Sequence, residues 1–266
     1  MKYTKETILR TVIQAAELYN ENLANKNIIF VGETPKHNLF YLESLFNDYN
    51  FLHLTGLEYI KSARQFFNDC INHRLNAKNI VIPNNKIQYV YLKMQVLLNA
   101  MAINKNAERI GDYNYSKDNI EVQKIIGTSN LCIGMSNISK EGKILKYYYP
   151  RTLLKDKINY NTTQHSKIVA VLSKDKGKEL YNEVTYLSQD TSIAKLFDHD
   201  KIGSMLDYET LYSKNPTYQL KINNFFIELS QIIKSNIAMK QGYNLSLFND
   251  NEKKNDKGDK EIDLNI

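Results

Sequence analysis

The segment SKIVAVLSK (166–174) is the most apolar of several strand-like segments in the second half of the chain, and it predicts a strand near the centre of a sheet. Gly142 and the pair Lys176-Gly177 mark turns in this region. Its neighbours alternate apolar and polar residues as half-buried strands do: EVQKIIG (121–127), SNLCIGMSN (129–137), GKILKYYYP (142–150) and ELYNEVTYLS (179–188). We therefore expect an antiparallel run of strands from about residue 107 to residue 188.

The first hundred residues show helical periodicity in three places. Thr4 can cap a helix that ends near Asn25, and Ser62 opens a second helix, SARQFFNDCINHRL (62–75). The segment 87–104 is apolar enough for a buried helix. Between these helices lie three segments that we interpret as strands: NIIFVGE (27–33), NLFYLESLF (38–46) and FLHLTG (51–56).

These elements predict an α+β fold, in which N-terminal helices pack on a curved antiparallel sheet. We assign residues 1–195 to this main domain. Residues 196–248 form a helical extension, whose segment 217–240 has a wide apolar face that could pack on the main domain or form a homodimer. Residues 249–266 are a charged tail with too few apolar residues to order itself.

The charge of the chain is unevenly distributed. The net charge is +6, and the segment from Asp250 to the end carries six acidic residues and four lysines, a charge of −2, which leaves +8 on residues 1–249. A basic body favours polyanionic partners, although a solvated lysine surface would look the same. Two cysteines cannot build a secreted disulfide scaffold. With no signal peptide and no apolar run of about 20 residues, we expect a cytoplasmic protein of a bacterial host cell.

Seven segments in order resemble one family. They are FLHLTG (51–56), SARQFFNDCINHRL (62–75), AERIGDYN (107–114), GTSNLCIGM (127–135), YYYPRTLLKDKI (147–158), HSKIVAVLSK (165–174) and YNEVTYLS (181–188). Together they resemble the phage Barnase–EndoU–colicin–RelE-like nucleases, in the branch with an F-x-H-L-T-G strand. The resemblance covers about residues 5–195 and implies helices packed on an antiparallel sheet. It also implies a metal-independent ribonuclease acting as a toxin or phage effector. Arg151 departs from the small residue or Asn that the resemblance leads us to expect there.

His53 is the first catalytic candidate. Cleavage of RNA without a metal needs a base for the 2′-hydroxyl and an acid for the 5′-oxygen, and histidine titrates in the right range for either role. On a strand, His53 and Thr55 would share one face while Leu52 and Leu54 enter the core, and Gly56 would leave that face open. The alternative is a buried histidine bonded to a backbone carbonyl, with Thr55 as an ordinary strand residue.

His165 and Lys167 are the second catalytic pair. They alternate with Ser166 and Ile168 along their strand, so they share one face and could supply an acid and a phosphate contact. At the end of a strand, however, both could be ordinary solvated side chains.

Five further residues are candidates for binding phosphate or RNA. Arg74, at the end of the second helix, could bind phosphate, although a cation at a helix C-terminus is also favoured by the helix dipole. Arg151 and Lys155, with Lys157, form a basic loop that could face RNA, although each alone could be an ordinary solvated charge. Tyr113 could stack on an unpaired base. Tyr186 could donate to phosphate, although a core aromatic suits its position equally well.

The sequence indicates no metal or cofactor. His37, His73 and His199 do not stand at metal-ligand spacing from other ligand residues, with Asp198-His199-Asp200 as a weak exception. No glycine-rich phosphate loop is present in the sequence.

Two functions therefore compete. The first is a metal-independent endoribonuclease of phage or prophage origin that uses His53, Thr55, His165 and Lys167. The second is a catalytically inactive nuclease fold that binds structured RNA or a host ribonucleoprotein, such as a phage inhibitor of host defence. RNA is the expected partner in both, and an antitoxin partner is possible in the first.

Overall fold

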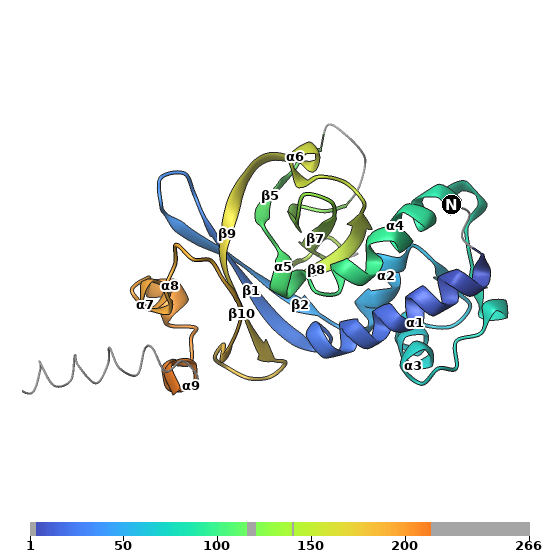
Figure 1. Cartoon of the computed structure of the whole chain (residues 1–266), viewed down its shortest axis with the longest axis horizontal. Coiled ribbons are helices and arrows are strands. Elements are labelled where there is room, and N and C mark those ends of the chain that lie inside the picture. Colours follow the sequence, from blue (N-terminus) through green and yellow to red (C-terminus); the bar gives the residue numbers. More distant parts are fainter. Residues whose placement is uncertain (1–3, 116–120, 140, 214–266) are drawn as a thin grey trace, which may run out of the picture. The chain divides into compact units, whose positions relative to one another are not determined.

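The computed structural model describes residues 4–115, 121–139 and 141–213 (Figure 1). One compact unit runs as far as Leu211, and residues from Tyr212 onward belong to a second unit. The predicted helix 217–240 and the charged tail lie outside the described residues. The predicted division at residue 195 stays a prediction, and the segment just after it belongs to the first compact unit.

Eight strands form one sheet, and seven of them close into a barrel. Around the ring the order is β1-β2-β8-β7-β6-β5-β9, and β9 pairs again with β1; β10 pairs with β9. All pairs are antiparallel except β2 with β8, which is parallel. The strands are β1 (Lys26–Glu33), β2 (Leu39–Phe46), β5 (Arg109–Tyr113), β6 (Lys124–Gly127), β7 (Cys132–Ile138), β8 (Ile144–Leu154), β9 (Thr162–Asp175) and β10 (Glu183–Leu187).

The α+β class is confirmed, but in place of the expected curved antiparallel sheet the strands close into a barrel with one parallel pair. The length of β9 explains the difference. Its first part pairs with β5, from Thr162 to Lys167, and its remainder pairs with β1, from Lys167 to Asp175. One strand thus joins the two ends of the sheet, which closes the barrel and removes most free edges. The predicted central position of the segment 166–174 follows, because β9 pairs with three strands.

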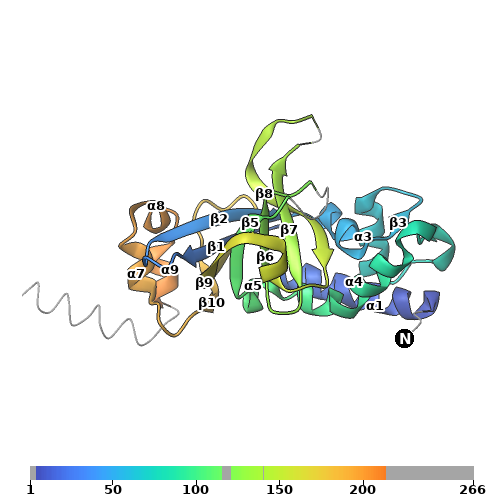
Figure 2. The ribbon, with the colours of Figure 1, turned by 90° about the horizontal axis from the view of Figure 1, so that it is seen from above.

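Helices gather at one end of the barrel (Figures 1 and 2). These are α1 (Lys5–Asn22), α2 (Phe51–Thr55), α3 (Ala63–Ile71) and α4 (Ile87–Ala100), while the short α5 (Ile103–Asn106) contacts β9 and β10. Thr4 and Ser62 cap α1 and α3 as predicted, each accepting a hydrogen bond from a backbone N–H three residues later. Tyr19 of α1 lies with Phe51 and Phe67 in an aromatic cluster with ring centroids 5.3–5.7 Å apart. One continuous core therefore joins the barrel interior to the helices.

The segment FLHLTG is a helix, and the predicted strand is wrong. A 3₁₀ turn at Asp48–Asn50 leads directly into α2. Phe51, Leu54 and Thr55 are fully buried, which is the i, i+3, i+4 spacing of one helix face. Gly56 then ends the helix with φ of 73°, in the left-handed region that glycine adopts most readily. His53 and Thr55 therefore do not share a strand face.

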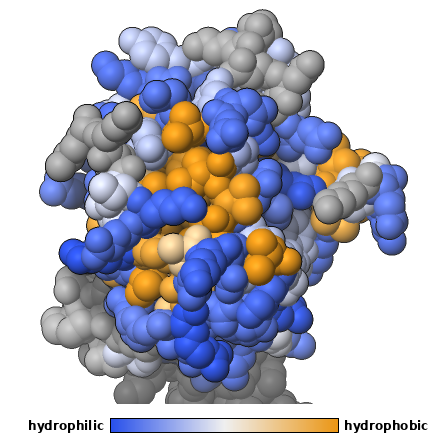
Figure 3. All heavy atoms as spheres, turned by 90° about the vertical axis from the view of Figure 1, so that its right-hand side faces the viewer, coloured by the Kyte–Doolittle hydropathy of each residue, from blue (hydrophilic) through white to orange (hydrophobic). Residues whose placement is uncertain are grey.

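The remaining elements are short. They are η1 (Asp48–Asn50), β3 (Glu58–Tyr59), η2 (Ala77–Asn79), β4 (Ile80–Val81), η3 (Asn84–Lys86), α6 (Ile158–Asn161), α7 (Ile193–Phe197), α8 (Asp200–Gly203) and α9 (Tyr208–Ser213). Hydrophobic residues form a patch on the helical end of the molecule (Figure 3), and exposed Val81, Ile87 and Leu92 belong to this part of the chain. Within the described ranges, no helix has the length and apolar character needed to cross a bilayer.

Candidate functional site

The four predicted catalytic residues do not converge. His53 lies on α2, which contacts β8, whereas His165 and Lys167 lie on β9. In the seven-strand ring, β8 and β9 are separated by two strands on one side and by three on the other. They therefore occupy opposite sides of the barrel, as Figure 1 shows. A single site cannot combine His53 with the β9 pair in this arrangement.

The hydroxyl group of Thr55 is already used within the fold. It donates to the carbonyl of Leu52 at 2.8 Å and accepts from the backbone N–H of Leu57 at 3.1 Å. The Thr55 side chain is fully buried. Both hydrogen bonds satisfy backbone groups where α2 ends, so Thr55 holds the turn and is not placed to meet a substrate.

Lys93 of α4 is the residue that the sequence interpretation missed. Its Nζ donates to the carbonyl of His53 at 3.2 Å, and its side chain crosses Gly56 so closely that a Cβ there would lie 3.0 Å from its Cδ. Burial, with a smaller contribution from the charge of Lys86, lowers the pKa of Lys93 to about 8. No carboxylate within the described ranges forms an ion pair with it. An amine that titrates near neutrality therefore lies beside the backbone of His53.

A second cation lies at the same junction. The helices α2 and α4 and the strand β8 all contact one another. Lys155, just after β8, donates from its Nζ to Oε1 of Gln95 on α4. We name His53, Lys93, Gln95 and Lys155 the junction site. Lys93 contacts the backbone of His53, whereas Gln95 follows Lys93 by two residues, so the pair of Gln95 and Lys155 lies on a different side of α4.

Arg151 has a local structural role. The pairing of β7 with β8 shifts between Gly134 and Met135, whose partners are Thr152 and Pro150, so Arg151 is the extra residue of a bulge. Its Nη2 donates to the carbonyl of Ile138 at 2.9 Å. Its Nε is buried and has no hydrogen-bond partner within the described part of the chain. The predicted basic loop of Arg151 and Lys155 is therefore divided between this bulge and the junction site.

The outer face of β9 carries His165 and Lys167. The predicted alternation is confirmed, because Gln164 and Ser166 line a cavity on the other face. Nδ1 of His165 lies 3.4 Å from the hydroxyl oxygen of Thr162. Nζ of Lys167 lies 2.7 Å from a carboxylate oxygen of Asp190, so the two form an ion pair. The hydrogen bond with Asp190 raises the pKa of Lys167 above its ordinary value. Lys167 is thus an exposed, neutralised cation.

The other predicted binding residues lie apart from one another. Arg74 lies beyond α3, which ends at Ile71, and its Nε is 3.9 Å from a carboxylate oxygen of Asp69. Tyr113 is buried, with its ring edge-on to Tyr115, which is exposed and remains available for stacking. Tyr186 packs against the main core, which agrees with the alternative interpretation that it is a core aromatic residue.

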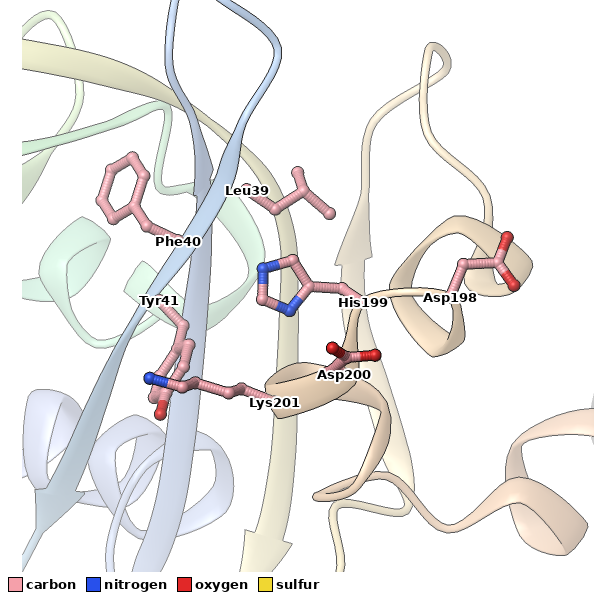
Figure 4. Close-up of a pocket in the computed structure, with 7 residues that line it drawn as sticks. All are labelled: Leu39, Phe40, Tyr41, Asp198, His199, Asp200 and Lys201. Carbon is pink, nitrogen blue, oxygen red and sulfur yellow. The ribbon is translucent and has the colours of Figure 1, made fainter.

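Two cavities adjoin strand β2. The barrel mouth, a cavity of about 280 Å³, is lined by residues of β2, β5, β6, β8 and β9 and by Thr34, which follows β1. A wider cavity of about 660 Å³ lies between β2 and the segment Asp198–Lys201 (Figure 4). In this segment Nδ1 of His199 accepts the backbone N–H of Ile202 and caps α8, while Asp198 points away from the cavity. The Asp198-His199-Asp200 triplet therefore begins a helix, and the described residues hold no group of three metal-binding side chains.

The position of Lys93 in the sequence could have identified it as a candidate. It lies three residues after buried Val90 and four before buried Leu97, which places a lysine within the apolar face of α4. A charged residue in such a position must be neutralised, paired or functional.

The fold and its junction site define an α+β barrel protein whose helices present cations beside one strand. The chain belongs to the phage-Barnase-EndoU-ColicinE5/D-RelE like nuclease family, in the group described as nuclease 4, whose sequence model matches residues 11–190. No curated protein and no solved structure matches the chain. The resemblance drawn from the seven segments is thereby confirmed at the level of the family.

Proposed function

We propose that the protein is an endoribonuclease that cleaves RNA by attack of the 2′-hydroxyl, without a metal ion. The observation that carries this proposal is Lys93. A lysine with a pKa of about 8 lies beside His53 in a chain of a nuclease family. Strongly shifted titratable groups gather at functional sites because catalysis needs groups that gain and lose protons near neutral pH.

The junction site can supply both proton transfers. The imidazole of His53 accepts the proton of the 2′-hydroxyl, and the 2′-oxygen forms a bond to phosphorus. The ammonium group of Lys93 gives its proton to the 5′-oxygen as the bond from phosphorus to that oxygen breaks. Lys155, at the same junction of elements, adds to the positive potential that attracts the phosphate. One proton is taken and one is returned, so the products are a 2′,3′-cyclic phosphate and a free 5′-hydroxyl.

The basic body of the chain supports RNA as the substrate. Residues 1–249 carry +8, which favours RNA through release of counterions. We propose that the protein acts in the cytoplasm of a bacterial host as a phage or prophage effector. An antitoxin or a host ribonucleoprotein would then be its protein partner, with a homodimer through 217–240 as an alternative use of that segment.

Cleavage of end-labelled RNA in excess chelator tests the proposal. We expect the full-length chain to cut RNA and to leave cyclic phosphate ends, and we expect His53→Ala to lose at least about 100-fold in rate. His73→Asn is the matched control, because His73 is an exposed histidine with φ of 53°, a conformation that asparagine also adopts. Intact RNA after incubation with folded wild type would overturn the proposal, as would full activity in His53→Ala.

One observation favours the second candidate function, an inactive fold that binds structured RNA. Of the four side chains predicted to be catalytic, only His53 lies at the junction site, and the hydroxyl of Thr55 is committed to the backbone. If binding is the function, His53→Ala retains the affinity for structured RNA and the effect in cells, and the wild type has no cleavage to lose.

A further inference from the structure

We propose that the barrel mouth is a binding site for one unpaired nucleobase. The site is distinct from the junction site, because residues of β5, β6 and β9 line it and none of the junction residues does. The inference rests on the proposed function only in taking the base from RNA.

The shape of the cavity selects a small planar group. Its volume of about 280 Å³ is just below the roughly 300–1,000 Å³ typical of small-molecule sites, so a base or nucleoside fits where a larger ligand does not. Its floor is apolar, because Leu42 and Ile110 are almost fully buried beneath it. Phe40, on the same side of β2 as Leu42, and Tyr148 add aromatic faces, on which bases stack.

The rim of the cavity matches the edge of a base. Asp112 and Lys124 form a cross-strand ion pair between β5 and β6, and Gln164 and Ser166 face them from β9. A carboxylate accepts N–H groups, an ammonium group donates to carbonyl oxygens, and an amide does both. The ion pair places an acceptor and a donor side by side at the rim, which suits recognition of the donor and acceptor pattern of one base over another.

A phosphate contact lies next to this cavity. The wider cavity shares Phe40 and Tyr41 with the barrel mouth, and Lys201 reaches across it from α8 toward β2 (Figure 4). Asp200 also lines that cavity, so its charge is mixed. An RNA chain whose base occupies the barrel mouth would therefore place an adjoining phosphate near the ammonium group of Lys201. This contact would add affinity for an oligonucleotide and none for a free nucleoside.

Binding of the four ribonucleosides and of short RNA oligonucleotides tests the proposal, with His53→Ala as the background so that cleavage does not interfere. We expect one nucleoside to be preferred in calorimetric titration. Ser166→Leu, which fills the mouth, should weaken its binding at least tenfold, and Asp112→Asn should change the order of preference. Thr163→Leu and Glu108→Gln are the matched controls, since both residues are exposed and neither lines the cavity.

Lys201→Met should weaken the oligonucleotide at least threefold and leave the nucleoside unchanged. Absence of nucleoside binding at millimolar concentration would overturn the inference, and so would equal binding by Ser166→Leu and Thr163→Leu. Failure here is distinguishable from failure of the nuclease proposal. RNA cleavage by the wild type, with no loss in Ser166→Leu, would leave the nuclease and remove the base site.

Discussion

Two lysines, Lys93 and Lys167, show opposite ways of placing a cation in this molecule. Lys93 lies partly buried between α4 and the end of α2, and burial lowers its pKa to about 8. Lys167 lies exposed on β9, and its bond with Asp190 raises its pKa. The sequence made Lys167 the better candidate, because it stands two residues from a histidine. The environment instead favours Lys93, since only a lysine whose charged form is destabilised exchanges protons readily near pH 7.

The largest expected effect is on the rate of RNA cleavage. Lys93→Met removes the proposed proton donor while keeping the length of the side chain, so we expect kcat/KM to fall at least about 100-fold. Lys167→Met should reduce it less than threefold. Steady-state cleavage of a fluorogenic RNA at pH 7 measures both variants. The reverse order of effects would move the site to β9 and would refute the comparison.

The second effect concerns how stability depends on pH. The folded-state pKa of Lys93 lies below its ordinary value of 10.5, so the unfolded chain binds this proton more strongly between about pH 8 and 10.5. The contribution of Lys93 to the free energy of unfolding therefore increases with pH across that window. We expect the difference between wild type and Lys93→Met to change by about 3 kcal/mol in favour of wild type from pH 7.5 to 10.5.

Urea unfolding of both proteins at several pH values measures this change, because titrations common to the two cancel in the difference. Lys167→Met should show no such rise between pH 7.5 and 10.5, since the pKa of Lys167 is shifted in the other direction. A flat difference for Lys93→Met would show that burial does not destabilise the charged form.

The smallest effect tests the close approach of Lys93 to Gly56. Gly56 and Gly142 both have positive φ, of 73° and 79°, but only Gly56 has Lys93 against the place of a Cβ, whereas Gly142 faces open space. Gly142→Ala should cost about 1 kcal/mol of unfolding free energy for its backbone conformation, and Gly56→Ala about 1 kcal/mol more. Equal losses, measured by urea unfolding, would mean that the lysine moves aside freely.

Most of the secondary structure was predictable because it depends on local pattern. The apolar run of residues 166–174 could only be a buried strand, and the capping residues Thr4 and Ser62 fixed where two helices begin. The segment FLHLTG was wrongly predicted to be a strand because it is short. Its leucines at 52 and 54 satisfy a period of two, while Phe51, Leu54 and Thr55 satisfy a helical face, and six residues cannot separate the two patterns.

The barrel and the site depended on long-range contacts that no local pattern records. Closure requires β1 to pair with β9 across more than a hundred residues of sequence, and the antiparallel pattern of each strand is the same in an open sheet. The strand prediction for residues 51–56 also put the side chains of His53 and Thr55 on the same face, which is wrong. Only the family resemblance, confirmed over residues 11–190, identified the kind of activity that the residues could serve.

The barrel is joined between β2 and β8 by a single residue pair, Ser44 with Tyr148, whereas β1 and β2 pair along their whole length. This seam runs beside the barrel mouth, since Tyr148, Tyr41 and Leu42 all line that cavity. Breathing motions should therefore concentrate there, and the amide hydrogens facing the seam should exchange with solvent sooner than those between β1 and β9. Separation of this one pair would widen the mouth while the long pairing of β1 with β9 stays intact.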